Sequence, residues 1–349
     1  MQCRFSTNNF SCKEIADNSG YCIFHKKNKN DLENKRFIEL IKKNKINDFN
    51  GFIFDVDFYI FEVIDYFYDE IKFSNVVFNK KAIFDNFKFS KNVIFKDVKF
   101  LGEVSFNNCI FENECSFYNL NFNENYINEK IFYKTLFYGQ NFIINKCVNL
   151  PRLDSIKFDD NTKIIMSDVN YYENQYLTGK INYRIAKNQA DKIGDYDRRD
   201  FYYCKEREYS YFLTNKNDYS SNTDYRFEKI FNFLEKYIIG YRKKSFRVFI
   251  ISIFIISMFA FFYCIAGVKT LNNELIYIDF KNIGTYSVLD IFKIYFEMWY
   301  FSLVTFSTLG YGDVIPYNSF GKILTITEVF TGIGMVAIWT SLIIKRMIK

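Results

Sequence analysis

The sequence predicts a chain of mixed architecture, with a β-helical solenoid in its N-terminal half, a helical linker, and an all-α membrane domain at its C-terminal end. Three observations support this prediction. Phenylalanines recur at alternating intervals of five and six over residues 71–122. Two stretches of 21 and 22 residues near the C-terminus are almost free of charge. The glycine-containing hexapeptide TLGYGD, residues 308–313, lies between those stretches.

Composition and charge restrict the functions that fit this chain. Its mean hydropathy is −0.15 although 49% of its residues are hydrophobic, so only part of it is expected in a membrane. The net charge of +6 over 349 residues is small and argues against a nucleic-acid-binding protein. The first ten residues are polar and do not resemble a cleavable signal peptide. We therefore expect the N-terminal half in the cytoplasm, with its thiols reduced.

Residues 1–48 are predicted to form an N-terminal cap with a short helix and a metal site. Three cysteines and the only histidine of the chain fall within it: Cys3, Cys12, Cys22 and His25. Three thiolates and one imidazole complete a tetrahedral ligand set for structural Zn²⁺, and Cys22-x-x-His25 has the spacing of a ligand pair. The gaps of eight and nine residues are looser than in a zinc finger. Free cytosolic thiols are the alternative to a zinc site.

The phenylalanine repeat predicts a solenoid. An apolar residue stands two positions before each phenylalanine, and neither a period of 3.6 nor a period of 2 fits this spacing. The spacing does fit a square coil. Each side of such a coil has two inward residues separated by one outward residue, and a turn follows. Asn and Lys fill the remaining positions, as suits solvated corners. The repeating residues are Phe73, Phe78, Phe84, Phe89, Phe95, Phe100, Phe106, Phe111, Phe117 and Phe122.

This pattern resembles the pentapeptide-repeat β-helix, which implies a right-handed solenoid over residues 49–170. The match is weaker over Phe137–Val169, and Asn123–Leu136 breaks it like an insertion. Solenoids of this kind bind or scaffold and rarely catalyse, so the resemblance implies an unidentified cytoplasmic ligand or protein partner. Some relatives mimic DNA with an acidic face, but residues 69–130 hold nine acids and eight lysines and are nearly neutral.

Residues 171–245 are predicted to be a helical linker. Thr178–Leu213 is charged and amphipathic, and Gly194 divides it into two helices. Phe227–Tyr241 is expected to lie at the membrane surface, with basic side chains near the lipid head groups. This segment connects the solenoid with the membrane domain, either as a mechanical link or as a passive spacer.

Two membrane spans are predicted within residues 246–349. Val248–Val268 carries no charge, and as a helix its 21 residues would extend about 31 Å, close to the thickness of a hydrocarbon core. In the second span, Ile323–Ile344, Glu328 is the only charge. Basic residues precede the first span and follow the second, which predicts that both termini are cytoplasmic. We expect Glu328 to face a subunit contact near the helix between the spans rather than an ion path.

The segment between the spans has the character of a re-entrant helix. Ser287–Leu309 is hydrophobic but is interrupted by charged residues. Non-helical backbone at membrane depth is tolerated where it lines a water-filled path. In the hexapeptide that ends this segment, Gly310 and Gly312 allow the backbone to turn so that successive carbonyls can replace the hydration shell of a monovalent cation. Carboxylates would instead favour divalent ions.

Residues 299–313, WYFSLVTFSTLGYGD, resemble the pore helix and selectivity filter of potassium channels, and residues 320–339 resemble the inner helix of the two-transmembrane prokaryotic kind. The resemblance implies transport of K⁺ by a homotetramer in which each chain supplies a quarter of the filter. The ion ligands would come from Thr308, Leu309, Gly310, Tyr311 and Gly312.

The resemblance also assigns roles around the filter. Asp313 would anchor the outer mouth through a donor at Tyr300. Gly332 and Gly334 match the region where inner helices bend, with close helix packing as the alternative. Val304 stands where some relatives hold a glutamate behind the filter, so that carboxyl group is absent.

Together these features predict a potassium-selective channel of the cell membrane, and not an enzyme, with regulation by the β-helix as a further hypothesis. A membrane-anchored pentapeptide-repeat scaffold and a less selective cation channel are the alternatives. The intact Gly-Tyr-Gly sequence favours selectivity over the second of these.

Overall fold

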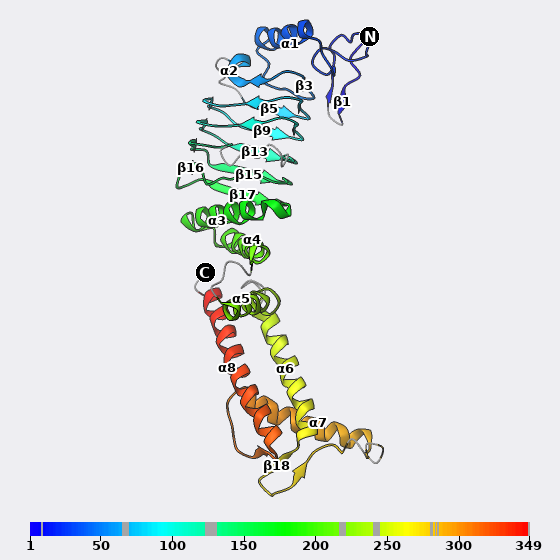
Figure 1. Cartoon of the computed structure of the whole chain (residues 1–349), viewed down its shortest axis with the longest axis vertical. Helices are drawn as coiled ribbons and strands as arrows, with labels where there is room; N and C mark the ends of the chain where they lie inside the picture. The colour runs from blue at the N-terminus through cyan, green and yellow to red at the C-terminus, as the bar shows by residue number, and fades with distance from the viewer. Residues whose placement is uncertain are drawn as a thin grey trace. The chain divides into compact units, whose positions relative to one another are not determined.

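The computed structural model describes all residues except 8–9, 65–69, 123–130, 216–220, 240–244, 280–281, 283, 285 and 348–349. The chain forms two compact units, residues 1–215 and 216–349 (Figure 1). The first unit contains the N-terminal cap, the β-helix and two further helices, and the second contains the apolar helices. The boundary therefore falls inside the predicted linker 171–245, because the first part of that linker packs on the β-helix.

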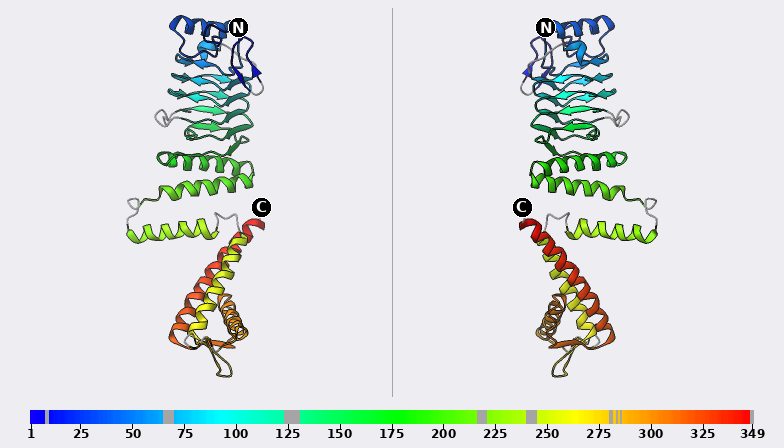
Figure 2. Two further views of the ribbon diagram at one scale, coloured as in Figure 1. Left: turned by 90° about the vertical axis from the view of Figure 1, so that its right-hand side faces the viewer. Right: turned by 90° about the vertical axis from the view of Figure 1, so that its left-hand side faces the viewer.

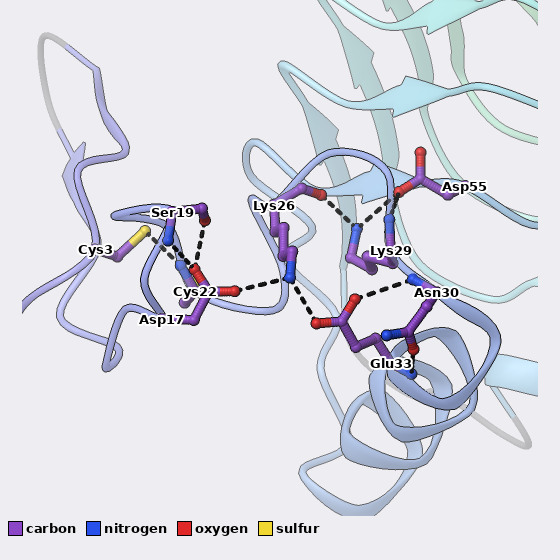
Figure 3. Close-up of polar contacts among 9 residues, drawn as sticks. All are labelled: Cys3, Asp17, Ser19, Cys22, Lys26, Lys29, Asn30, Glu33 and Asp55. Carbon is purple, nitrogen blue, oxygen red and sulfur yellow. Dashed lines mark hydrogen bonds and ion pairs between the residues drawn. The ribbon is translucent and has the colours of Figure 1, made fainter.

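The N-terminal cap is held to the β-helix by polar contacts and aromatic packing. Helix α1 begins with a capping box in which the side chain of Asn30 accepts from the backbone of Glu33 and the Glu33 side chain accepts from the backbone of Asn30. The buried ammonium of Lys29 donates to the carbonyl oxygens of Lys26 and Ile53 at 2.7 and 2.6 Å. It also lies 3.5 Å from a carboxylate oxygen of Asp55, so it joins the cap to the first coil (Figure 3). The elements of the cap are β1 (Ser6–Thr7), β2 (Phe10–Ser11) and α1 (Asp31–Lys43).

Parallel strands stack into coils, and over residues 71–118 the period is 22 residues. Residue 72 pairs with residue 94, and residue 94 pairs with residue 116. The inward phenylalanine rings stack between coils, with centroids 4.5 to 5.4 Å apart. The strands are β3 (Ile53–Phe54), β4 (Phe58–Tyr59), β5 (Ile71–Ser74), β6 (Val77–Phe78), β7 (Ala82–Ile83), β8 (Lys88–Phe89), β9 (Val93–Lys96), β10 (Lys99–Phe100), β11 (Val104–Ser105), β12 (Ile110–Phe111), β13 (Cys115–Tyr118), β14 (Thr135–Phe137), β15 (Asn141–Asn145), β16 (Ile156–Phe158) and β17 (Lys163–Ser167), and the short helix α2 (Ile60–Val63) follows β4.

The corners of the coils explain the polar residues of the repeat. At every eleventh position a residue adopts a positive φ between 53° and 59°, a conformation that asparagine and aspartate tolerate better than most residues. The corner side chains of neighbouring coils also bond to one another, as when the amide of Asn108 donates to Asn86 at 3.1 Å. The five corner residues of this series are Asn75, Asn86, Asp97, Asn108 and Asn119.

The expected insertion Asn123–Leu136 is shorter than the sequence suggested. Residues 123–130 lie outside the described part of the chain. Ile131 and Phe132 are buried in the core, and β14 pairs with β12 from Leu136 onward. The coil therefore resumes at residue 131, because the apolar side chains there still fill inward positions.

Two helices close the C-terminal end of the β-helix. Helices α3 (Tyr176–Lys192) and α4 (Tyr196–Leu213) follow the short η2 (Glu173–Gln175) and lie across the last coil (Figure 2). The hydroxyl of Tyr202 donates to the carbonyl of Ile164 at 2.9 Å and accepts from the backbone N–H of Met166 at 3.0 Å. The end of a parallel coil exposes such backbone groups, so these contacts protect it from pairing with another edge.

The second unit is built around two apolar helices. Helices α6 and α8 are long and apolar enough to cross a membrane, judged by length and composition. Helix α7 packs against both of them. The elements are α5 (Asn222–Leu234), a turn of π-helix η4 (Glu235–Ile239), α6 (Ser245–Ala266), β18 (Val268–Thr270), β19 (Leu275–Ile276), α7 (Val288–Phe306), β20 (Val314–Pro316) and α8 (Ser319–Met347).

Candidate functional site

Helix α7 leads directly into the hexapeptide. It begins with a capping box in which Ser287 accepts from the backbone N–H of Asp290. At its other end the N–H of Thr308 donates to the carbonyl of Thr305, and the N–H of Leu309 donates to the carbonyl of Val304, both at 3.0 Å. These bonds fix the direction in which the chain leaves the helix.

The backbone of residues 308–312, the filter segment, alternates between two conformations. Thr308, Gly310 and Gly312 have φ values of +58°, +56° and +77°, whereas Leu309 and Tyr311 are not in the positive-φ region. Glycine adopts such values without steric cost, but Thr308 is β-branched and is strained there. In a regular extended strand, successive carbonyls point to opposite sides. A left-handed residue at every second position turns them to the same side. The backbone can therefore present a row of neutral oxygens.

The side chains around the filter segment divide into exposed and anchored ones. Leu309 and Tyr311 are 60% and 66% exposed in the single chain. Asp313 is anchored, because one of its carboxylate oxygens accepts from the hydroxyl of Tyr300 at 2.7 Å and the other from the N–H of Val314 at 3.1 Å. The structure thus brings Tyr300 and Asp313 together across the end of the segment.

The two inner-helix glycines have different surroundings. A Cβ atom added to Gly332 would lie 2.1 Å from the carbonyl oxygen of Phe306, so glycine at this position permits close contact between α8 and α7. Among the described residues, no atom apart from the adjoining residues and backbone of α8 lies within 4 Å of the corresponding point at Gly334. Helix α8 runs without interruption through both residues. The packing explanation therefore has a direct contact at Gly332, and a role in bending remains a prediction for both glycines.

Glu328 lies inside the chain, against α6 and α7. It is fully buried, and its carboxylate is bonded to the hydroxyl groups of Tyr263 and Ser302. The expectation of a subunit contact was wrong in this respect, because helices of its own chain already cover the side chain. Sequence analysis missed Tyr263 and Ser302; polar side chains within otherwise apolar stretches were the available signal.

Comparison with known proteins identifies the two parts of the chain. Residues 275–349 match the family model described as "Ion channel". These residues are an ion channel domain. Residues 84–126 match the model described as "Pentapeptide repeats (9 copies)", and the described residues 84–122 of this match lie in the β-helix. No solved structure matches the chain.

Two curated proteins are similar over short segments. "Two-pore potassium channel 4" of Arabidopsis thaliana is 54% identical over 41 residues, which is 12% of this chain and 14% of that protein. "Probable potassium channel protein 2" of Methanocaldococcus jannaschii is 38% identical over 55 residues, 16% of each chain. The matched segments thus cover less than a fifth of the length of either relative.

Away from the channel domain, the predicted ligand residues of the cap converge on one point. The ligand atoms of Cys3, Cys12, Cys22 and His25 all lie within 4.8 Å of one another, and all four residues are buried. The Sγ atoms of Cys12 and Cys22 are 3.8 Å apart. Two thiolates on a tetrahedral zinc, each with a Zn–S distance of about 2.3 Å, would be separated by about 3.8 Å. The cluster therefore has the ligand types of a structural zinc site and, at this pair of thiols, the separation that zinc ligands need.

The orientation of His25 also fits a metal ligand. Its Nε2 lies 3.0 Å from the carbonyl oxygen of Asn50, to which it can only donate, so Nδ1 is left without a proton. Nδ1 faces the thiols, 3.1 Å from the Sγ of Cys22 and 3.5 Å from that of Cys3. A histidine ligand commonly has its second nitrogen bonded to a backbone carbonyl in this way. The ring of Phe5 stacks on the imidazole at a centroid distance of 4.0 Å and fixes its plane.

The protonation of the cluster depends on whether a metal ion is bound. Burial raises the pKa of the Cys22 thiol to about 12, and burial lowers the pKa of the His25 imidazole. Both groups are therefore neutral near pH 7 when only protein atoms surround them. A bound divalent cation would supply the positive charge that favours thiolates and would release protons.

Proposed function

We propose that the chain forms a potassium-selective channel, a homotetramer whose ion path is lined by the backbone carbonyls of residues 308–312. The alternation of positive φ at Thr308, Gly310 and Gly312 is the observation that carries this proposal. One chain supplies one such row of carbonyls, and a closed ring of ligands needs several copies. The potassium-channel names of the two similar proteins agree with K⁺ as the transported ion.

The same proposal includes a topology with two spans, α6 and α8, and both termini in the cytoplasm of the cell. It rests on the basic residues that precede the uncharged stretch Val248–Val268 and follow the apolar stretch Ile323–Ile344: Arg242, Lys243, Lys244 and Arg247, then Lys345, Arg346 and Lys349. Helix α5 lies at the membrane surface in this arrangement. Its residues Phe227, Ile230, Phe231 and Leu234 share one face by helical spacing and are all exposed, as suits an interfacial helix.

Zn²⁺ is the proposed structural ion of the cap, held by Cys3, Cys12, Cys22 and His25. The donor set, the 3.8 Å separation of two thiols and the bond from His25 to Asn50 support it. Zinc would hold the loops on either side of the cluster together at the start of the β-helix.

The β-helix is proposed to bind a cytoplasmic ligand or protein and to bias the channel. A ligand shifts a gate only if it binds the open and closed states differently. Removal of residues 1–240 separates regulation from simple assembly. A changed open probability with unchanged conductance supports regulation, whereas unchanged opening across voltage, pH and divalent-ion conditions in assembled tetramers contradicts it.

Ion flux into liposomes tests the central proposal. The purified protein should pass K⁺ and Rb⁺, exclude Na⁺, and be blocked by external Ba²⁺. Equal Na⁺ and K⁺ fluxes from assembled tetramers would identify a less selective cation channel. Absence of any flux from such tetramers would favour a membrane-anchored scaffold.

A further inference from the structure

One buried carboxylate connects the three helices of the channel domain. The Oε2 atom of Glu328, on α8, accepts from the hydroxyl of Tyr263, on α6, at 2.7 Å. Its Oε1 atom is bonded to the hydroxyl of Ser302, on α7. All three residues have no measurable exposure in the single chain. A carboxylate in such surroundings is costly unless it is hydrogen-bonded, so its two partners are required for its burial.

The two hydroxyl groups are themselves held in place. The Tyr263 ring packs edge-on against Phe301 at a centroid distance of 4.8 Å, and its hydroxyl also lies 3.3 Å from Thr325. The Ser302 hydroxyl lies 2.9 Å from the carbonyl oxygen of Ile256 on α6. Each hydroxyl carries one proton, and Glu328 is the acceptor that the two hydroxyl groups share, so the carboxylate ties α7 and α6 to α8 at one point.

This contact is aligned with the filter segment. Gly332 follows Glu328 by one helical turn, and Phe306 follows Ser302 by one turn. Gly332 is also the residue whose missing side chain admits the Phe306 carbonyl. Two successive turns of α8 therefore hold two successive turns of α7, and the second of these ends two residues before Thr308.

We propose that Glu328 is a positioning residue for the filter segment. Its carboxylate fixes the position of α7 along α6 and α8. The close contact between Gly332 and Phe306 fixes the end of α7, two residues before the filter segment begins. The role is indirect, since the carboxylate contacts hydroxyl groups on α6 and α7 and is covered by its own chain. This inference rests on the proposed channel function.

Substitution of Glu328 tests the proposal in the full-length protein reconstituted in liposomes. Glu328→Leu keeps a similar volume and removes the acceptor that the two buried hydroxyl groups share. Glu328→Gln keeps an acceptor for one hydroxyl and a donor for the other. We expect Glu328→Leu to lower the K⁺/Na⁺ permeability ratio about tenfold, as the loss of one buried hydrogen-bonding partner allows, and Glu328→Gln to stay within about twofold. Thr327→Val, which removes a hydroxyl that bonds to the carbonyls of Ile323 and Leu324 on its own helix, serves as the matched control.

The outcomes distinguish a failure of the positioning role of Glu328 from a failure of the proposed channel function. A wild-type permeability ratio for assembled Glu328→Leu tetramers, or equal damage by Leu and Gln, overturns the positioning role. If Glu328→Leu does not assemble, the variants Ser302→Ala and Tyr263→Phe test the positioning role in its place. Each removes one hydrogen-bond donor to Glu328 with little change of volume. A wild-type protein that does not discriminate K⁺ from Na⁺ contradicts the proposed function itself.

Discussion

The hydroxyl of Tyr300 donates a 2.7 Å hydrogen bond to the carboxylate of Asp313, and this bond spans the filter segment from the helix that precedes it to the residue that follows it. At the other end, the N–H of Leu309 is bonded to the carbonyl of Val304 on the same helix. Helix α7 therefore holds both ends of the segment. The strained backbone between them is maintained by contacts that lie outside it.

Tyr300→Phe removes the bond at the outer end without changing the size of the ring. We expect K⁺ flux to begin normally and to decline several-fold faster than in the wild type, because the unanchored Asp313 lets the strained segment relax. Time-resolved K⁺ flux or channel recording measures this. Tyr295→Phe on the same helix is the control, since its hydroxyl bonds to the Ser257 carbonyl away from the filter segment. An equal decline in both variants would refute a specific role of Tyr300.

Gly310→Ala tests the backbone requirement of the filter segment. In the part of the chain that the structure describes, no atom beyond the adjoining residues lies within 4 Å of the added methyl group, so its effect comes from the positive φ, which costs an L-residue about 1–2 kcal/mol. We expect loss of K⁺ flux from tetramers that still assemble. Gly194→Ala, which places a methyl group in equally open surroundings at a φ of +71° in the turn between α3 and α4, should keep its flux. Full flux through Gly310→Ala would show that the left-handed conformation is dispensable.

Metal analysis tests the cysteine cluster. The purified, reduced protein should contain about one Zn²⁺ per chain, and Cys22→Ser combined with His25→Ala should contain none. Cys204→Ser, a half-buried cysteine outside the cluster, is the matched control. Because protons compete for the thiols and the Cys22 pKa is about 12 without metal, zinc should dissociate as the pH falls. A metal-free wild type prepared without chelator would leave the four residues as ordinary core groups.

Glu206→Gln tests the helices that close the β-helix. Glu206, on α4, accepts from Arg184 and Lys187, on α3, at 2.8 and 2.6 Å. Burial alone would raise its pKa, but these two cations lower the pKa below the ordinary value of 4.5. The two ion pairs of Glu206 therefore stabilise the fold at pH values above 4.5. This stabilisation is lost as the pH falls through the lowered pKa of Glu206.

We expect Glu206→Gln to lower the unfolding temperature of the full chain by about 2–4 °C at neutral pH, the shift that 1 kcal/mol causes in a domain of this size. The difference should shrink in acid, where the wild-type carboxylate is also protonated. Thermal unfolding followed by circular dichroism at both pH values measures it. Glu208→Gln, which breaks a half-exposed pair with Lys205 on the same helix, should have little effect. An undiminished difference in acid would exclude the charge interaction as its cause.

Local patterns in the sequence determined much of this protein. The recurrence of phenylalanine at five and six residues predicted a solenoid, since side-chain direction within each short strand follows from backbone geometry alone. The uncharged stretches predicted the apolar helices α6 and α8, because length and polarity decide what crosses a membrane. The hexapeptide predicted an ion channel, and the family match over residues 275–349 agrees. In each case the signal and the structure it specifies lie within the same few residues.

Only the tertiary structure decided which distant residues meet. The spacing of apolar residues in α3 and α4 predicted helices of a linker. It did not predict that the Tyr202 hydroxyl bonds to the last coil of the β-helix. Tyr263, Ser302 and Glu328 are polar residues in three separate apolar helices, and their shared hydrogen bonds depend on how those helices pack. The close approach of Gly332 to Phe306 likewise depends on packing. Periodicity records which face of an element is buried, but partners are selected by shape and hydrogen bonding between elements, which no local spacing encodes.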